Sequence, residues 1–295
     1  METVEAFRRL ARSSPWLWRT MRITHEDGEG PPVRAWIRRP DSLRVETLGG
    51  EVLEARPGDS APAGSAVLMV GAQGSMPESY TDATLRDAAE TALTDPDHPG
   101  TGVRWWTDPL VEPPARDADG LVIDPIGWQD SVAVDDAMWT NYRWVAMLNP
   151  RELADGVDGS PAVAVDQLSA GIRSGRPTLF ATVRPLTGYD PRCGCCPLLP
   201  SLQSQVADGV VNSRGPFADA HRVAVDLATG VCVAAHEIGG PRDGAGFEVH
   251  IEAVDEEYGD DLFAPTVQSR LRGLFDPLGS LVQGRQPGTD PESAG

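Results

Sequence analysis

The chain has 295 residues and a formal net charge of −19 at pH 7, with 40% hydrophobic and 23% charged residues, as is ordinary for a soluble globular protein. No apolar run approaches the roughly 20 residues of a membrane-spanning helix, so we expect no transmembrane segment. A protein this acidic repels the phosphate backbone of nucleic acids, so we expect no nucleic-acid binding. All 25 basic residues are arginine, which excludes a P-loop and a Schiff-base lysine.

The first 56 residues predict one helix followed by an antiparallel meander. Apolar side chains recur at helical spacing at Val4, Phe7, Leu10 and Ala11. The segment Ser13-Ser14-Pro15 is expected to end this helix. Alternating apolar residues and turn signals then predict strands within 15–24, 33–40, 43–48 and 51–56.

The middle of the chain has fewer clear signals. Residues 57–66 (PGDSAPAGSA) are typical of a flexible connection, and we interpret about 57–135 as an elaborated insertion with a short helix over 82–93. Beyond it, residues 135–148 predict a helix that Asn149-Pro150 ends. Two further strands are expected at 162–172 and 177–185, joined by a turn at 173–176.

The last third predicts a second meander, with strands at 222–227, 231–238 and 247–254. In the last of these, Phe247, Val249 and Ile251 alternate with polar residues, so we expect a sheet with one apolar face and one solvated face. An amphipathic helix over 266–275 precedes a tail, 286–295, whose composition predicts disorder.

These elements predict an α+β protein built on a strongly curved antiparallel sheet, an open and incomplete β-barrel, with helices packed on the concave side. Neither meander alone has enough apolar faces to close a core. We therefore expect a single domain over 1–285, including the insertion at about 57–135, followed by the disordered tail.

Two parts of the sequence carry a resemblance to a known family. Near the start, WLWRTMRIT leads to VRAWIRRPDSLRVE; near the end, VAVDLATGVCVAAHEIGG is followed by GFEVHIEAVDEEYGDDLFAP. In order and spacing this arrangement resembles the LolA/LolB-like lipoprotein carriers, over roughly residues 1–56 and 221–264. The resemblance implies an open antiparallel barrel, partly plugged by helices, with an apolar interior able to hold acyl chains.

The leading functional hypothesis is a non-enzymatic binding protein that holds an apolar ligand, a lipid or acyl chain, or a protein partner in the concave face. The residues expected to line that face are Trp18, Ile37, Val225, Val249 and Ile251. No hydrolase or metalloprotease motif is present, so we expect no enzymatic activity. The N-terminus lacks the apolar stretch of a signal peptide, which predicts a cytoplasmic protein.

The cysteines support a different class of function. Cys193, Cys195 and Cys196 fall within four consecutive positions, and Cys232 follows on a predicted strand. Cys193 and Cys196 have the C-x-x-C spacing of paired zinc ligands, and His221, His236 and His250 are candidates to complete a set. Cys232 and His236, however, are about 13 Å apart at about 3.3 Å per strand residue, too far to bind one ion.

Four interpretations of this CGCC loop stay open: a metal site, with zinc as the ion; a redox dithiol; a disulfide from Cys193 or Cys195 to Cys232; or buried thiols that pack as small apolar groups. The expected cytoplasmic location disfavours a stable disulfide. We favour the packing role, with no cofactor. A metal- or thiol-dependent site at Cys193, Cys195, Cys196 and Cys232 is the alternative.

Overall fold

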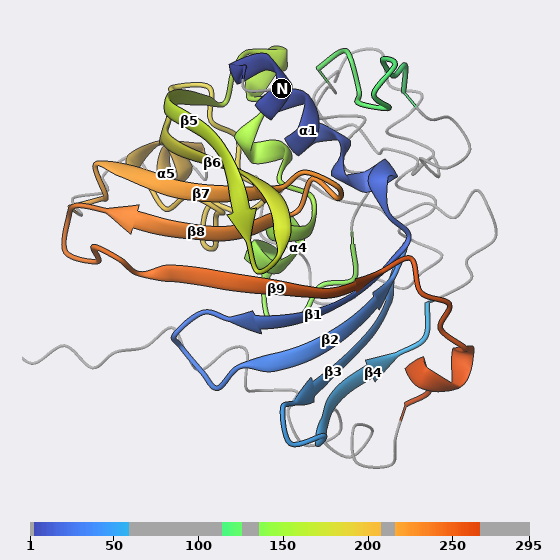
Figure 1. The fold of residues 1–295 in the computed structure, drawn as a ribbon. Helices are drawn as coiled ribbons and strands as arrows, with labels where there is room; N and C mark the ends of the chain where they lie inside the picture. Colours follow the sequence, from blue (N-terminus) through green and yellow to red (C-terminus); the bar gives the residue numbers. More distant parts are fainter. Residues whose placement is uncertain (1–2, 59–113, 126–135, 208–215, 266–295) are drawn as a thin grey trace, which may run out of the picture.

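The computed structural model describes residues 3–58, 114–125, 136–207 and 216–265 (Figure 1). They form one nine-stranded antiparallel sheet in the order β4-β3-β2-β1-β9-β8-β7-β6-β5. The strands are β1 (Thr20–Glu26), β2 (Val33–Arg38), β3 (Ser42–Thr47), β4 (Val52–Arg56), β5 (Val163–Arg173), β6 (Arg176–Pro185), β7 (Ala220–Asp226), β8 (Cys232–Ile238) and β9 (Gly246–Val254).

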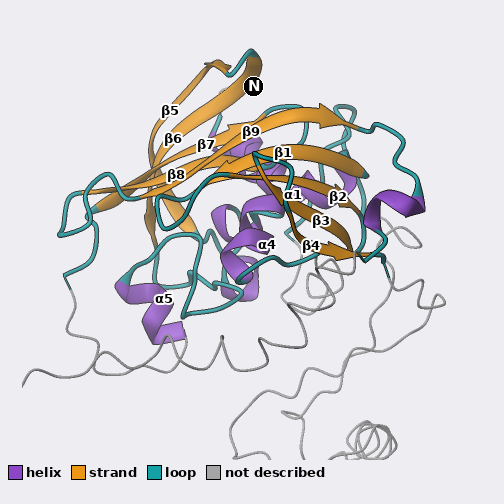
Figure 2. Cartoon of the chain, turned by 90° about the horizontal axis from the view of Figure 1, so that it is seen from below, coloured by secondary structure: helices purple, strands orange, loops and turns teal. Residues whose placement is uncertain are grey.

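The sheet is curved but not closed into a barrel, because the edge strands β4 and β5 do not pair with each other (Figure 2). The α+β class with a curved antiparallel sheet is confirmed. The predicted helices over 82–93 and 266–275, the predicted tail and most of the predicted insertion lie outside the described residues. Within the described part, no helix is long and apolar enough to cross a membrane.

The first and last meanders join at the centre of the sheet, where β1 pairs with β9. The register places Ile23 opposite Ile251 and opposite Ala35 of β2. Because strand side chains alternate between faces, these apolar residues share one face, which is buried. Arginines of β1 and β2 share the opposite face, where Arg22 and Arg34 both bind Glu252 of β9 at 3.0 Å.

The hairpin of β5 and β6 crosses the outer face of the sheet in front of β7 and β8 (Figure 1). Its two-residue turn has positive φ at Ser174 (48°) and Gly175 (78°), as a type I′ hairpin requires. Arg173 at its tip forms an ion pair with Glu248 of β9. His250 of β9 is exposed, so the solvated face that we expected is present there. The same expectation is wrong for β7 and β8, because these strands are largely buried on both faces.

Helix α1 (Val4–Leu17) passes through the segment predicted to end it. Ser13 Oγ donates to Arg9 O at 2.5 Å, and Ser14 Oγ donates to Leu148 O at 2.6 Å. These serines therefore find partners without leaving the helix. Pro15 has no backbone N–H and therefore removes one hydrogen bond from the helix. The loss is small because Pro15 lies near the C-terminal end of α1, where few further hydrogen bonds depend on it.

Helix α4 is shorter than predicted and runs only from Tyr142 to Leu148. Asn141 caps it by accepting from Arg143 N at 3.0 Å, and Thr140 has a φ of 62°, which no helix continues through. The end before Asn149-Pro150 is confirmed. The other helical segments among the described residues are η1 (Arg151–Leu153), η2 (Val157–Gly159), α5 (Leu202–Ala207) and η3 (Asp260–Phe263).

Two arginines, whose side chains are only 3% and 8% exposed, hold these helices in place. Arg12 of α1 makes a bidentate pair with Asp155 at 3.0 and 2.6 Å. Arg39, just after β2, pairs with Asp136 at 2.6 and 2.9 Å and stacks 3.4 Å from the centroid of Trp18.

The Arg39 guanidinium also donates to three backbone carbonyls: Ser14 O at 2.7 Å, Trp18 O at 3.2 Å and Leu148 O at 3.4 Å. These carbonyls belong to the C-terminal ends of α1 and α4, where helices leave acceptors unpaired. One side chain therefore fixes both helix ends beside β2.

We predict that Arg39→Met lowers the free energy of unfolding by about 3–5 kcal/mol, because it leaves Asp136 charged and buried without its partner. Arg184→Met is the matched control: Arg184 binds Asp166 with almost the same bidentate distances, 2.7 and 2.9 Å, on the exposed surface. Water screens that pair, so its loss should change stability little. Equal losses of unfolding free energy in the two variants, measured by urea unfolding, would contradict the prediction.

A second prediction concerns pH. His25 packs edge-on against Trp144, with ring centroids 5.1 Å apart, and burial lowers its pKa from 6.5 to about 4; burial also lowers the pKa of His221 to about 4. The native state then binds fewer protons than the unfolded state below pH 6.5, so stability falls with decreasing pH. Each histidine contributes about 1.4 kcal/mol per pH unit until its folded pKa is reached.

His25→Phe should make the unfolding free energy less dependent on pH between pH 6.5 and 5, because unfolding of the variant takes up one proton fewer. Urea unfolding at a series of pH values measures this slope. A slope identical to that of the wild-type protein would show that His25 does not titrate as its burial implies.

Candidate functional site

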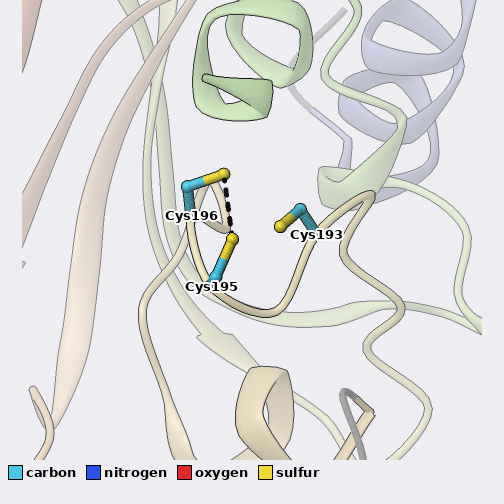
Figure 3. Close-up of side chains that lie close together, drawn as sticks. All are labelled: Cys193, Cys195 and Cys196. Atoms are coloured by element: carbon cyan, nitrogen blue, oxygen red, sulfur yellow. Dashed lines mark hydrogen bonds between the residues drawn. The ribbon is translucent and has the colours of Figure 1, made fainter. Parts of the chain in front are cut away.

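Three thiols meet in the loop between β6 and α5. The Sγ atoms of Cys193, Cys195 and Cys196 all lie within 4.8 Å of one another, and those of Cys195 and Cys196 are 3.7 Å apart (Figure 3). Cys195 is exposed, while Cys193 and Cys196 are half-buried. The sequence predicted a metal or thiol site at these three cysteines and Cys232; the structure brings the first three together.

The start of α4 lies against this loop. The backbone N–H of Tyr142 hydrogen-bonds to Cys196, and Arg143 Nε donates to Pro197 O at 3.3 Å. These contacts hold the second half of the loop beside the helix.

A buried carboxylate lies beneath the loop and binds both of its ends. Glu152 of η1 is 2% exposed and accepts hydrogen bonds from Arg192 N at 2.9 Å and Leu198 N at 3.1 Å. It also accepts from Tyr189 Oη at 2.6 Å. Sequence reasoning missed Glu152, because an isolated glutamate in RELAD carries no local signal that distinguishes it from a surface residue.

The thiols of the cluster differ in acidity. Burial raises the pKa of Cys193, but hydrogen bonds donated to its sulfur by the thiols and backbone N–H groups of Cys195 and Cys196 outweigh burial and lower it. Burial, together with the hydrogen bond and charge of Cys193, raises the pKa of Cys196 to about 12. Cys193 is therefore the first of this pair to form the thiolate, which is the form that binds metals and attacks electrophiles.

Cys232 is not part of this cluster. Its side chain is fully buried on β8, its thiol donates to Ala234 O at 3.3 Å, and burial raises its pKa to about 12. All four cysteines are free, so the structure contains no disulfide from Cys193 or Cys195 to Cys232. Among the described residues, no histidine or carboxylate joins the three clustered thiols as a further potential ligand.

The five residues expected to line a ligand site lie in the hydrophobic core. Their exposed fractions are 2% for Trp18, 0% for Ile37 and Val225, 4% for Val249 and 5% for Ile251. They belong to one cluster of buried residues that includes Phe7 and Leu10 of α1 and Met147 of α4. A ligand could contact them only by displacing these packed side chains.

Comparison with known proteins adds no relative: no family model, curated protein or solved structure matches this chain. A function for this chain can therefore be inferred only from the geometry of the molecule itself.

The burial of the thiols predicts their reactivity. In the native protein, iodoacetamide should modify the clustered thiols and should leave Cys232 unmodified until the protein unfolds. Mass spectrometry of peptides after timed alkylation, with and without denaturant, measures this. Modification of native Cys232 as fast as Cys195 would contradict the prediction.

Proposed function

We propose that this protein binds a thiophilic metal ion through Cys193, Cys195 and Cys196, and that the preferred ion is Zn²⁺. The observation that supports the proposal is the distance between the sulfurs. Tetrahedral zinc with Zn–S bonds of about 2.3 Å places its sulfur ligands about 3.8 Å apart. Cys195 and Cys196 have this separation, 3.7 Å, and all three sulfurs lie within 4.8 Å of one another.

Three protein ligands leave the fourth position of a tetrahedral ion open. Sites of this kind bind water or an incoming ligand there, whereas structural zinc sites have four protein ligands. Because Cys195 is exposed, an ion bound to it would lie near the surface of the protein. The arrangement is therefore better suited to an ion that exchanges or takes part in a reaction than to an ion that only stabilises the fold.

Binding must displace the thiol protons, since thiolates are the metal ligands. The lowered pKa of Cys193 favours the first of these losses. The predicted cytoplasmic location fits the proposal, because a reducing compartment keeps the three thiols free of disulfides.

The LolA/LolB-like carrier function is a second proposal. The curved, unclosed sheet and its continuous apolar face favour it. In this proposal the helices occupy the concave side in the absence of ligand, and an acyl chain or a protein partner replaces α1 there. Native mass spectrometry with fatty acids tests it: no complex, together with unchanged tryptophan fluorescence, counts against the lipid version.

We predict that the wild-type protein binds one Zn²⁺, and that Cys195→Ser weakens binding more than about 100-fold, beyond the 10–100-fold effect typical of contacts outside the ligand set. Competition with a chromophoric chelator measures affinity, and elemental analysis measures stoichiometry. Cys232→Ala is the control that leaves the three clustered thiols intact. Wild-type protein without zinc affinity, or full affinity in Cys195→Ser, would refute the site.

A further inference from the structure

The loop that carries the three thiols is closed at both ends by one buried carboxyl group. Glu152 Oε1 accepts from the N–H of Arg192, the residue before Cys193. Glu152 Oε2 accepts from the N–H of Leu198, two residues after Cys196. All three cysteines therefore lie between two backbone groups that meet at a single side chain.

Tyr189 binds the next residue after Leu198, so it holds the same end of the loop as Glu152. Its hydroxyl donates to Glu152 Oε2 at 2.6 Å and accepts from Leu199 N at 3.0 Å. Tyr189 is 1% exposed, so both hydrogen bonds are shielded from water. The hydroxyl fixes the Glu152 carboxyl group and also holds the outgoing chain.

A buried carboxyl group is a costly way to stabilise a fold. Burial raises the pKa of Glu152, which measures the penalty on its charged form, although its three hydrogen bonds and the charge of Arg192 oppose it. A well-packed apolar side chain often stabilises an interior as well as a buried ionic group does. An apolar residue cannot, however, accept hydrogen bonds from two ends of a loop at once.

We propose that Glu152 and Tyr189 are positioning residues for the three-thiol site, which set the spacing of its sulfurs by closing the loop around them. This inference rests on the proposed metal-binding function and deepens it. Groups that orient metal ligands from outside the ligand set typically change affinity 10–100-fold when removed.

Two substitutions test the proposal. Glu152→Gln keeps the shape of the side chain but replaces one acceptor oxygen with an NH₂ group, so Arg192 N and Leu198 N cannot both be bound. Tyr189→Phe removes only the hydroxyl. We expect zinc affinity to fall about 10–100-fold in Glu152→Gln and by less in Tyr189→Phe.

The control is Leu43→Ala in β3, a fully buried residue on the other half of the sheet. This truncation destabilises the fold by leaving a cavity in the core, and it leaves the loop contacts intact. It should therefore lower the unfolding midpoint without changing zinc affinity. Equal zinc affinity in Glu152→Gln and Leu43→Ala, with both folded, would overturn the positioning role.

Co²⁺ in place of Zn²⁺ provides a spectroscopic measurement of ligand geometry. The positions and intensities of its visible thiolate bands should change in Glu152→Gln and stay the same in Leu43→Ala. Unchanged bands in Glu152→Gln would contradict the proposal, since a residue with only a structural role would leave the ligand geometry of the folded protein unaltered.

A metal-free measurement separates failure of this inference from failure of the proposed function. Phenylarsine oxide condenses with two neighbouring thiols and releases water, so its capture depends on the spacing of the sulfurs and requires no metal ion. If the wild-type protein captures it but binds no zinc, the metal function fails; slower capture by Glu152→Gln still supports the positioning role. Equal capture rates in wild type, Glu152→Gln and Leu43→Ala would overturn that role.

Discussion

The buried guanidinium of Arg39 is the contact on which the arrangement of the helices depends. It joins Asp136, the face of Trp18 and the last carbonyls of α1 and α4 beside the end of β2. Each of these groups would be costly to bury alone, because a charge or a backbone carbonyl without a partner loses its hydration. Arginine suits this position because its planar group offers several donors in fixed directions.

This contact also determines where the three-thiol loop lies. Arg39 fixes the last residue of α4, Leu148, while the first residues of the same helix bind Cys196 and Pro197. The chain then continues directly into η1, which presents Glu152 to the ends of the loop. The pair of Arg12 with Asp155 anchors the chain just beyond η1 to α1. The loop therefore lies against a helical segment that Arg39 and Arg12 hold in place.

The strands could be predicted well because their signal is local. Side-chain alternation and turn residues located β2, β5, β6 and β9 to within a residue or two of their observed bounds. The end of α1 and the start of α4 were predicted poorly, whereas the end of α4 before Asn149-Pro150 was predicted correctly. Ser14 stays helical by bonding Leu148, and α4 begins at an Asn141 cap that a continuous helical pattern had concealed. Of the candidate site, the sequence identified the three cysteines but not Glu152 or Tyr189.

By itself, the sequence determined the strand segments, their apolar faces and the crowding of three thiols into four positions, since these follow from residue order and backbone geometry. Only the tertiary structure decided that β1 pairs with β9, that the β5–β6 hairpin covers the outer face, and that the presumed lining residues are core. It also separated Cys232 from the other thiols and brought Glu152 beneath them. These outcomes depend on packing and hydrogen bonds between residues far apart in the chain, 40 positions for Glu152 and Arg192 and 236 for Arg19 and Asp255, which no local pattern encodes.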